Sequence, residues 1–212
     1  GFPGNLTCKV TFSLTDDDAI DIRYSAETDR TTVVNMTNHS YFNLDGDPSK
    51  SNSDYLLTID ADAYTPVDST FMTTGEIVSV EGTDMDFRTP TAVGARIDND
   101  FEQLKNGKGY DHNWVVDGPA GTLRPAARAW SEETGIVLAV STTMPGVQFS
   151  TGNYLDGCPA GKGNAPYGKR WGFCLETQFF PDAVHHPDFP SIILRRGETY
   201  RQRTVYQVKE SK

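Results

Sequence analysis

The sequence predicts an all-β protein, because short segments of alternating apolar and polar residues follow one another without a regular alternation of strands and helices. Turn signals separate these segments; they are Asp45-Gly46, Asp117-Gly118-Pro119, Thr134-Gly135, Pro145-Gly146, Asp156-Gly157 and Arg196-Gly197. Many short strands joined by such turns form a sandwich or a barrel. Neither an internal repeat nor a linker interrupts the 212 residues, so we expect a single domain over residues 1–212.

The first two strands are expected to pair as an antiparallel hairpin. In residues 6–14 and again in residues 19–27, apolar side chains alternate with polar ones, as in strands with one buried face. The acidic run at residues 16–18 supplies a polar turn between them. The side chains expected on the buried faces are Leu6, Cys8, Val10, Phe12 and Leu14, followed by Ile20, Ile22, Tyr24 and Ala26.

Later segments continue the strand pattern, and one segment is typical of a helix. Similar runs occur at residues 30–37, 54–61, 112–118, 135–144, 172–180 and 200–208. A further strand is expected to carry Gln148 after the Pro145-Gly146 turn. The helix is expected to begin after an Asn99 cap, with Glu102 three residues later, and to end at Gly107.

Composition and charge exclude several classes of partner. Hydrophobic residues make up 37% and charged residues 23%, and no apolar run approaches the ~20 residues of a membrane helix. The net charge is −10 and no basic run is present, whereas binding to phosphates needs clustered Lys and Arg. We therefore expect neither nucleic acid nor a membrane as a partner, and the charge balance is compatible with a neutral substrate.

The three cysteines do not form a disulfide framework. We expect free thiols at Cys8, Cys158 and Cys174, with a bridge between Cys158 and Cys174 as the alternative. Neither a Cys-x-x-Cys motif nor histidines at zinc-ligand spacing occur in the sequence. The sequence therefore predicts no metal site.

Four polar residues are candidates for chemistry, and three of them have an ordinary structural alternative. Glu176 lies in the middle of an apolar strand, where a buried carboxylate needs a partner or has a raised pKa; alternatively, it is solvated on an exposed strand face. Asp111 stands at a loop-to-strand junction, as a functional side chain or as a turn cap. The side-chain amide of Gln148 could hydrogen-bond a sugar hydroxyl. The imidazole of His39 is either functional or hydrogen-bonded within a loop network.

Motifs at four places, taken together, resemble the aldose 1-epimerase (galactose mutarotase) family. They are NMTNHSYFNLDG at residues 35–46, GYDHNWVVDG at 109–118, MPGVQFSTGNYLDG at 144–157 and LETQFFPDAVHHPDFPSIILRRGETY at 175–200. The resemblance covers essentially the whole chain. It implies a large antiparallel β-sandwich, with His39 as catalytic acid, Glu176 as catalytic base, and Asp111 and Gln148 in contact with sugar hydroxyls.

The chemistry that this resemblance implies suits the residue types. Mutarotation opens a pyranose ring and recloses it on the other face of C1, so a carboxylate removes the proton of the C1 hydroxyl and an imidazolium protonates the ring oxygen. We expect a small-molecule aldose as substrate and no cofactor. The alternative is a non-catalytic sugar-binding or structural subunit of a larger assembly. A hexose-6-phosphate epimerase is disfavoured, because no clear Arg cluster for phosphate is visible.

Members of this family carry a substantial portion before the GFPGNL segment at which this chain begins. The resemblance therefore implies a fragment, to which an upstream portion adds strands, a second active-site histidine and an Asn-Arg pair that contacts the sugar. Residues 1–212 alone are expected to aggregate through open sheet edges. Three glycosylation sequons begin at Asn5, Asn35 and Asn38, and a glycan on Asn38 would crowd His39, so a cytoplasmic location is expected.

Overall fold

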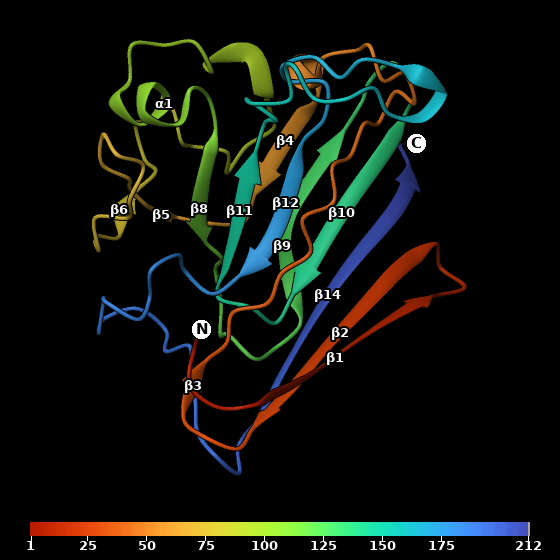
Figure 1. Ribbon diagram of the computed structural model, residues 1–212. Coiled ribbons are helices and arrows are strands. Elements are labelled where there is room, and N and C mark those ends of the chain that lie inside the picture. The colour runs from red at the N-terminus through yellow and green to blue at the C-terminus, as the bar shows by residue number, and fades with distance from the viewer. Residues whose placement is uncertain (212) are drawn as a thin grey trace.

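The computed structural model describes residues 1–211, in which two antiparallel sheets lie face to face (Figure 1). The seven-stranded sheet has the spatial order β1 (Leu6–Leu14), β2 (Ala19–Thr28), β14 (Thr199–Glu210), β10 (Ile136–Thr142), β9 (Arg124–Trp130), β4 (Leu56–Ile59) and β7 (Thr91–Ala92). The five-stranded sheet has the order β12 (Cys174–Gln178), β11 (Gly146–Ser150), β8 (Asp111–Val115), β5 (Ala63–Thr65) and β6 (Val78–Ser79). A small third sheet pairs β3 (Thr32–Val33) with β13 (Ile193–Leu194).

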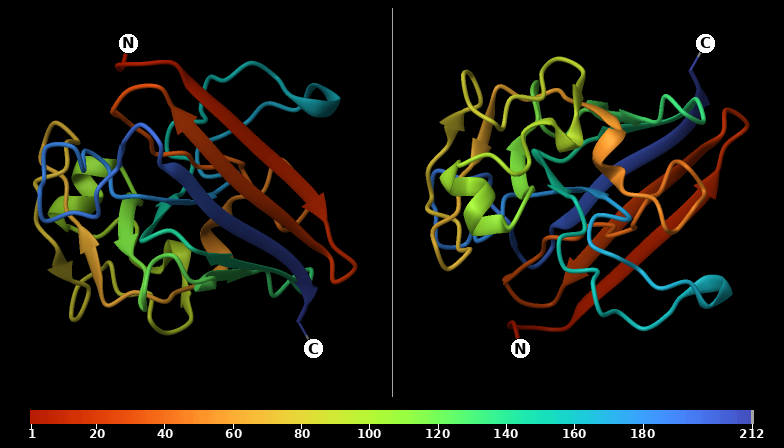
Figure 2. Two further views of the ribbon diagram at one scale, coloured as in Figure 1. Left: turned by 90° about the horizontal axis from the view of Figure 1, so that it is seen from below. Right: turned by 90° about the horizontal axis from the view of Figure 1, so that it is seen from above.

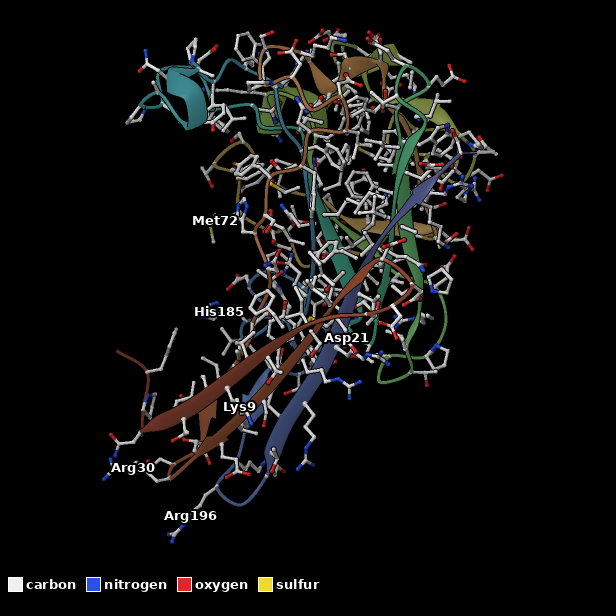
Figure 3. All side chains as sticks on the ribbon, turned by 90° about the vertical axis from the view of Figure 1, so that its right-hand side faces the viewer. Lys9, Asp21, Arg30, Met72, His185 and Arg196 are labelled. Atoms are coloured by element: carbon white, nitrogen blue, oxygen red, sulfur yellow. The ribbon has the colours of Figure 1, made fainter. Side chains whose placement is uncertain are left out.

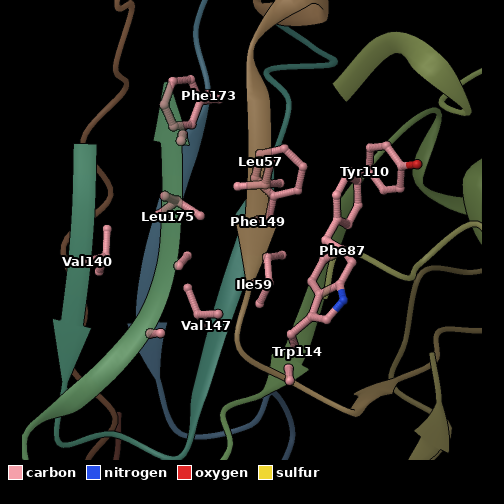
Figure 4. Close-up of a cluster of buried hydrophobic side chains, with 14 of the residues drawn as sticks. Leu57, Ile59, Phe87, Tyr110, Trp114, Val140, Val147, Phe149, Phe173 and Leu175 are labelled. Atoms are coloured by element: carbon pink, nitrogen blue, oxygen red, sulfur yellow. The ribbon is translucent and has the colours of Figure 1, made fainter. Parts of the chain in front are cut away.

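The core lies between the two large sheets, so the sandwich is confirmed and the barrel is not formed (Figure 4). Its buried side chains include Leu57, Ile59 and Val140 from the seven-stranded sheet and Val147, Phe149 and Leu175 from the five-stranded sheet. Trp114 of β8 is fully buried, and its indole N–H donates to the carbonyl oxygen of Met85 at 3.0 Å. One face of β8, β11 and β12 therefore packs against the core. The opposite faces of these three strands together form the outer face of the five-stranded sheet.

The hairpin of β1 and β2 is confirmed, with Leu6 opposite Thr28 and Leu14 opposite Ile20. The expectation that β1 has one buried face is wrong, because every residue of β1 is exposed, including Phe12 at 61% and Leu14 at 86%. Ile20 is exposed as well. The reason is position: β1 is the edge strand, and the hairpin projects beyond the five-stranded sheet, so residues 1–211 place no second layer over its apolar face (Figures 1 and 2).

An ion-pair cluster fastens β2 to β14 on the outer face of the seven-stranded sheet. Asp21 is only 5% exposed, and Figure 3 shows it beside β14. The Arg203 guanidinium donates to both carboxylate oxygens of Asp21, at 2.9 and 2.8 Å, and Arg23 donates at 3.1 Å. These hydrogen bonds, that from Arg203 above all, hold the pKa of Asp21 below its usual value.

The helix and one strand differ from expectation. The helix α1 spans Glu102–Gly107, so its end at Gly107 is confirmed, but Phe101 rather than Asn99 occupies the N-cap position. The Asn99 amide instead donates to Asp84 at 2.9 Å. Of the strand expected at residues 30–37, only β3 forms a ladder. Three short 3₁₀ turns complete the described elements: η1 (Asn52–Asp54), η2 (Val93–Ala95) and η3 (Lys162–Asn164).

Within residues 1–211, no helix has the length and apolar character needed to cross a bilayer.

Candidate active site

His39 lies in an irregular segment that runs antiparallel to β12, the edge strand of the five-stranded sheet. At one end of the segment the Asn35 amide donates to the carbonyl oxygen of Phe179 at 2.9 Å and accepts from its N–H at 3.0 Å. At the other end, Phe42 and Phe173 exchange two backbone hydrogen bonds of 2.8 and 3.0 Å. Because the segment is held at both ends, His39 stays beside the middle of β12.

The His39 imidazole and the Glu176 carboxyl group are in contact, with 3.3 Å between His39 Nε2 and Glu176 Oε1. The Glu176 side chain is only 8% exposed, whereas that of His39 is 55% exposed. Every residue of β12 is buried, so the interpretation of Glu176 as a solvated residue on an exposed strand face is wrong. Burial, with the Asp111 carboxylate as a second cause, raises the pKa of Glu176 to about 7.

The strand register brings Asp111 and Gln148 to the same face as Glu176. Gln148 of β11 lies opposite Glu176 of β12 and opposite Asn113 of β8, and Asp111 shares the face of Asn113 because it is two residues away. The Gln148 amide donates from Nε2 to Asp111 Oδ1 at 3.0 Å. Burial raises the pKa of Asp111, and this hydrogen bond and the charge of His39 oppose the rise.

The four residues singled out in the sequence therefore come together from three neighbouring strands and one flanking segment. They combine an imidazole, two carboxylates with raised pKa values, and an amide donor. A carboxylate with a pKa near 7 can accept a proton at neutral pH, and the adjacent imidazole can deliver one, so the arrangement is suited to general acid–base chemistry on a polar substrate.

Two further side chains border the pair, and sequence reasoning did not select them. The Tyr41 ring lies 5.3 Å from the His39 ring, centroid to centroid, and burial raises the pKa of Tyr41 to about 12. Cys174, two residues before Glu176 on the same face, is fully buried, and burial raises the pKa of its thiol. The period of two in β12 is the signal that could have placed Cys174 in this site.

Within the part of the chain that the structure describes, His39, Cys174 and Glu176 form a group that could hold a metal ion, because their potential ligand atoms all lie within 4.8 Å of one another. A cation bound there would occupy the imidazole nitrogen and the carboxylate oxygen that acid–base chemistry needs. Metal binding and proton transfer by His39 and Glu176 would therefore exclude each other.

The fold and the site describe a β-sandwich protein with an imidazole–carboxylate pair beside a polar sheet face. The aldose 1-epimerase family model matches residues 1–207, and the chain belongs to this family. It is 45% identical over 207 residues to galactose mutarotase of Homo sapiens and 42% identical over 209 residues to aldose 1-epimerase of Escherichia coli K12. Each alignment covers 98% of this chain, but only 58% of the human protein and 60% of the bacterial one.

Solved structures agree with this assignment. An aldose epimerase homologue from C. elegans superposes with a TM-score of 0.88 at 29% identity, covering 100% of this chain and 62% of that one. A galactose 1-epimerase from Lactobacillus acidophilus superposes with a TM-score of 0.85 at 28% identity, covering 100% and 59%. The predicted family and its antiparallel β-sandwich are confirmed, and the chain spans about three fifths of the length of these relatives.

The raised pKa of Glu176 predicts a pH profile for catalysis by this site. If Glu176 acts as a base, it must be ionised, so kcat/KM falls about tenfold per unit as the pH drops below about 7. Because the Asp111 carboxylate contributes to raising this pKa, Asp111→Asn moves the acidic limb to lower pH. Initial rates from pH 5 to 8 measure the acidic limb of the wild type and that of the variant. An acidic limb that stays in place in Asp111→Asn, or moves to higher pH, contradicts the effect of Asp111 on the pKa of Glu176.

Proposed function

We propose that the protein is an aldose 1-epimerase that interconverts the α and β anomers of a free hexose such as glucose or galactose. The observation that carries the proposal is the 3.3 Å contact between His39 and the buried Glu176, on a sheet face that also presents Asp111 and Gln148. Membership of the aldose 1-epimerase family supports it. A purely structural or sugar-binding subunit has no need of a buried carboxylate whose pKa is raised to about 7.

The proposed reaction uses the pair as base and acid. Glu176 takes the proton of the C1 hydroxyl, His39 protonates the ring oxygen, and the bond between C1 and the ring oxygen breaks to leave an aldehyde. Rotation about the C1–C2 bond followed by the reverse transfers closes the ring with the other configuration. Both reacting oxygens are attached to C1, so an acid and a base that lie side by side can reach them at once.

Asp111 and Gln148 are proposed to hold the hydroxyl groups that do not react. Asp111 offers carboxylate oxygens as acceptors, and Gln148 keeps one amide hydrogen beyond the one that it donates to Asp111. Holding the rest of the sugar leaves C1 free to rotate in the open-chain form. The proposal needs no cofactor, because each step moves only protons and the electrons of one C–O bond.

Polarimetry tests the proposed function. Fresh α-D-glucose or α-D-galactose loses optical rotation slowly in buffer, and the natural protein is expected to accelerate the approach to equilibrium in proportion to its concentration. A rate equal to that of buffer would leave the non-catalytic sugar-binding subunit as the better description.

We also propose that residues 1–212 are the C-terminal portion of one longer β-sandwich domain, completed by an upstream portion of the same protein. Two observations support this: the apolar face of β1 lies uncovered, and the chain spans 58% of human galactose mutarotase. The 55% exposure of the His39 side chain leaves one side of the site open to such a portion. The upstream portion would then complete both the core and the sugar site.

A cytoplasmic location is the last part of the proposal. The three cysteines are free, as predicted, and the Asn35 amide is occupied by its two hydrogen bonds to Phe179. Intact and peptide mass spectrometry of protein from its natural source is expected to show an unmodified 35–40 peptide and three free thiols. A hexose-series mass increment on that peptide, or a bridge between Cys158 and Cys174, would contradict a cytoplasmic location.

A further inference from the structure

A hydrogen-bonded network of side-chain amides, called the amide network below, crosses the polar face of the five-stranded sheet and ends at Asp111. Gln178 donates from Nε2 to Gln148 Oε1 at 3.2 Å and reaches Asn113 Oδ1 at 3.5 Å. Asn113 in turn donates from Nδ2 to Thr65 Oγ1 at 3.3 Å. The amide network thus connects β5, β8, β11 and β12 beneath the proposed sugar site. Among the described contacts, Gln178 is the only side chain that links Asn113 to Gln148.

Because the amide network is buried, the orientation of each amide decides whether its hydrogen bonds are formed. Asn113 is 2% exposed and Gln178 is 9% exposed, so water does not readily replace a lost partner. The amide of Gln148 has two possible orientations, which exchange its oxygen and its nitrogen. In one orientation, the nitrogen faces Asp111 and the oxygen faces the Gln178 nitrogen. In the other, the oxygen would face the Asp111 carboxylate and the nitrogen would face the Gln178 nitrogen, so both contacts would be repulsive.

A glycine makes the space through which Gln178 reaches its partners. In the strand register, Gln178 lies opposite Gly146, which carries no side chain. A Cβ atom at Gly146 would lie 2.4 Å from Asn113 Oδ1 and 3.0 Å from the Phe180 ring. Any larger residue would therefore displace Asn113 or Phe180. The Pro145-Gly146 turn at the start of β11 consequently supplies both the change of chain direction and the space for the amide network.

We propose that Gln178 is a positioning residue that fixes the amide orientation of Gln148, so that Gln148 presents an N–H donor to Asp111 and a second N–H donor to the sugar. This inference deepens the proposed function and rests on it. Gln178 acts through Gln148, and the donor character of Gln148 sets which sugar oxygen it can hold. The site then pairs a fixed donor with a fixed acceptor, Asp111, for neighbouring hydroxyl groups.

A double-mutant cycle in the natural protein tests the inference. The probe is 1,5-anhydro-D-glucitol, which lacks the C1 hydroxyl and so binds without reacting, and its Kd is measured by calorimetry. Gln178→Met removes the donor at similar volume and is expected to raise Kd about 3- to 10-fold, the loss of one hydrogen bond. In the Gln148→Met background the same change is expected to alter Kd less than about twofold.

A second variant separates positioning from a merely structural role. Gln178→Glu keeps the shape of the side chain, but its carboxylate cannot donate to Gln148 until it is protonated. The ratio of its Kd to that of the wild type at the same pH is expected to fall toward one as the pH is lowered, whereas the ratio for Gln178→Met stays constant. Urea unfolding curves of Gln178→Glu at each pH show whether the variant stays folded over the measured range, so that a loss of stability is separated from a loss of positioning.

The outcomes separate this inference from the proposed function. Equal losses from Gln178→Met in both backgrounds, or no loss in the wild type, overturn the positioning role while Gln148→Met still weakens binding and mutarotation continues. If the wild type neither binds the probe nor accelerates mutarotation, the proposed function and the inference fall together. A ratio for Gln178→Glu that stays above one and does not fall as the pH is lowered also overturns the positioning role.

Discussion

Replacement of Glu176 by glutamine is expected to lower kcat for mutarotation by about 10²- to 10⁴-fold and to leave sugar binding nearly unchanged. The side chain is buried and its pKa is raised to about 7, so in the wild type the carboxylate accepts a proton readily at neutral pH. An amide of the same shape cannot accept the proton of the C1 hydroxyl. Initial rates by polarimetry and Kd values for 1,5-anhydro-D-glucitol measure the two effects separately.

Two comparisons sharpen this test. His39→Asn is expected to lower kcat to a similar extent, since the reaction needs both transfers. Glu132→Gln removes an exposed carboxylate from the turn between β9 and β10, away from the site, and is expected to leave kcat unchanged. A Glu176→Gln protein with nearly wild-type kcat would refute the assignment of the base, whatever the behaviour of His39→Asn.

Phe12→Ser in the natural protein is expected to lower the free energy of unfolding by about 3 kcal/mol. In residues 1–211 Phe12 is 61% exposed on the apolar face of β1, and a substitution at an exposed position changes the free energy of unfolding by less than about 0.5 kcal/mol. The large value applies if an upstream portion covers this face, because the variant then leaves a cavity and buries a hydroxyl. Urea unfolding curves measure the difference.

The matched control lies on the opposite face of the same strand. Thr11 is adjacent to Phe12, exposed, and on the polar face that borders Arg23 of β2. Thr11→Ala is expected to change the free energy of unfolding by less than about 0.5 kcal/mol. Equal, small effects of Phe12→Ser and Thr11→Ala would show that the apolar face of β1 stays in water, contrary to the proposed completion of the sandwich.

The alternation of side chains predicted the fold class and most strands, since a period of two reports which face is apolar. It could not report whether that face is covered: β1 and β12 show the same pattern, yet β1 is exposed throughout and β12 is buried throughout. Coverage depends on what packs against the strand, which one strand does not encode. The Asn99 cap failed for a related reason, because its amide has a tertiary partner in Asp84.

Pro125 explains why the alternation of apolar and polar residues did not predict the strand β9. The strand β9 spans Arg124–Trp130 in the interior of the seven-stranded sheet, where a proline is unfavourable. Pro125 is tolerated because it lies where the register with β10 shifts and beyond the residues that pair with β4. Such an irregularity arises from the pairing of three strands, so the local sequence of β9 argues against a strand that nevertheless forms.

The candidate site was predictable in its residues but not in its connections. Motif resemblance selected His39, Asp111, Gln148 and Glu176, and the structure brings all four together. The role of Gln178 needed the register, because its contact with Gln148 runs diagonally between strands that are distant in sequence. A period of two in β12 puts Gln178 on the face of Glu176, and only the pairing of β11 with β12 shows which side chains Gln178 contacts.

The proposed catalysis of exchange at C1 by Glu176 and His39 together can be tested by measuring the exchange of anomers at equilibrium. Two-dimensional exchange NMR of equilibrated glucose or galactose reports passage between the α and β C1 signals without any net reaction. We expect exchange cross-peaks with the natural protein, at a rate that grows with its concentration. For Glu176→Gln we expect these cross-peaks to vanish while the variant still binds 1,5-anhydro-D-glucitol. Exchange at the buffer rate with the natural protein, or undiminished exchange with Glu176→Gln, would contradict the proposed catalysis.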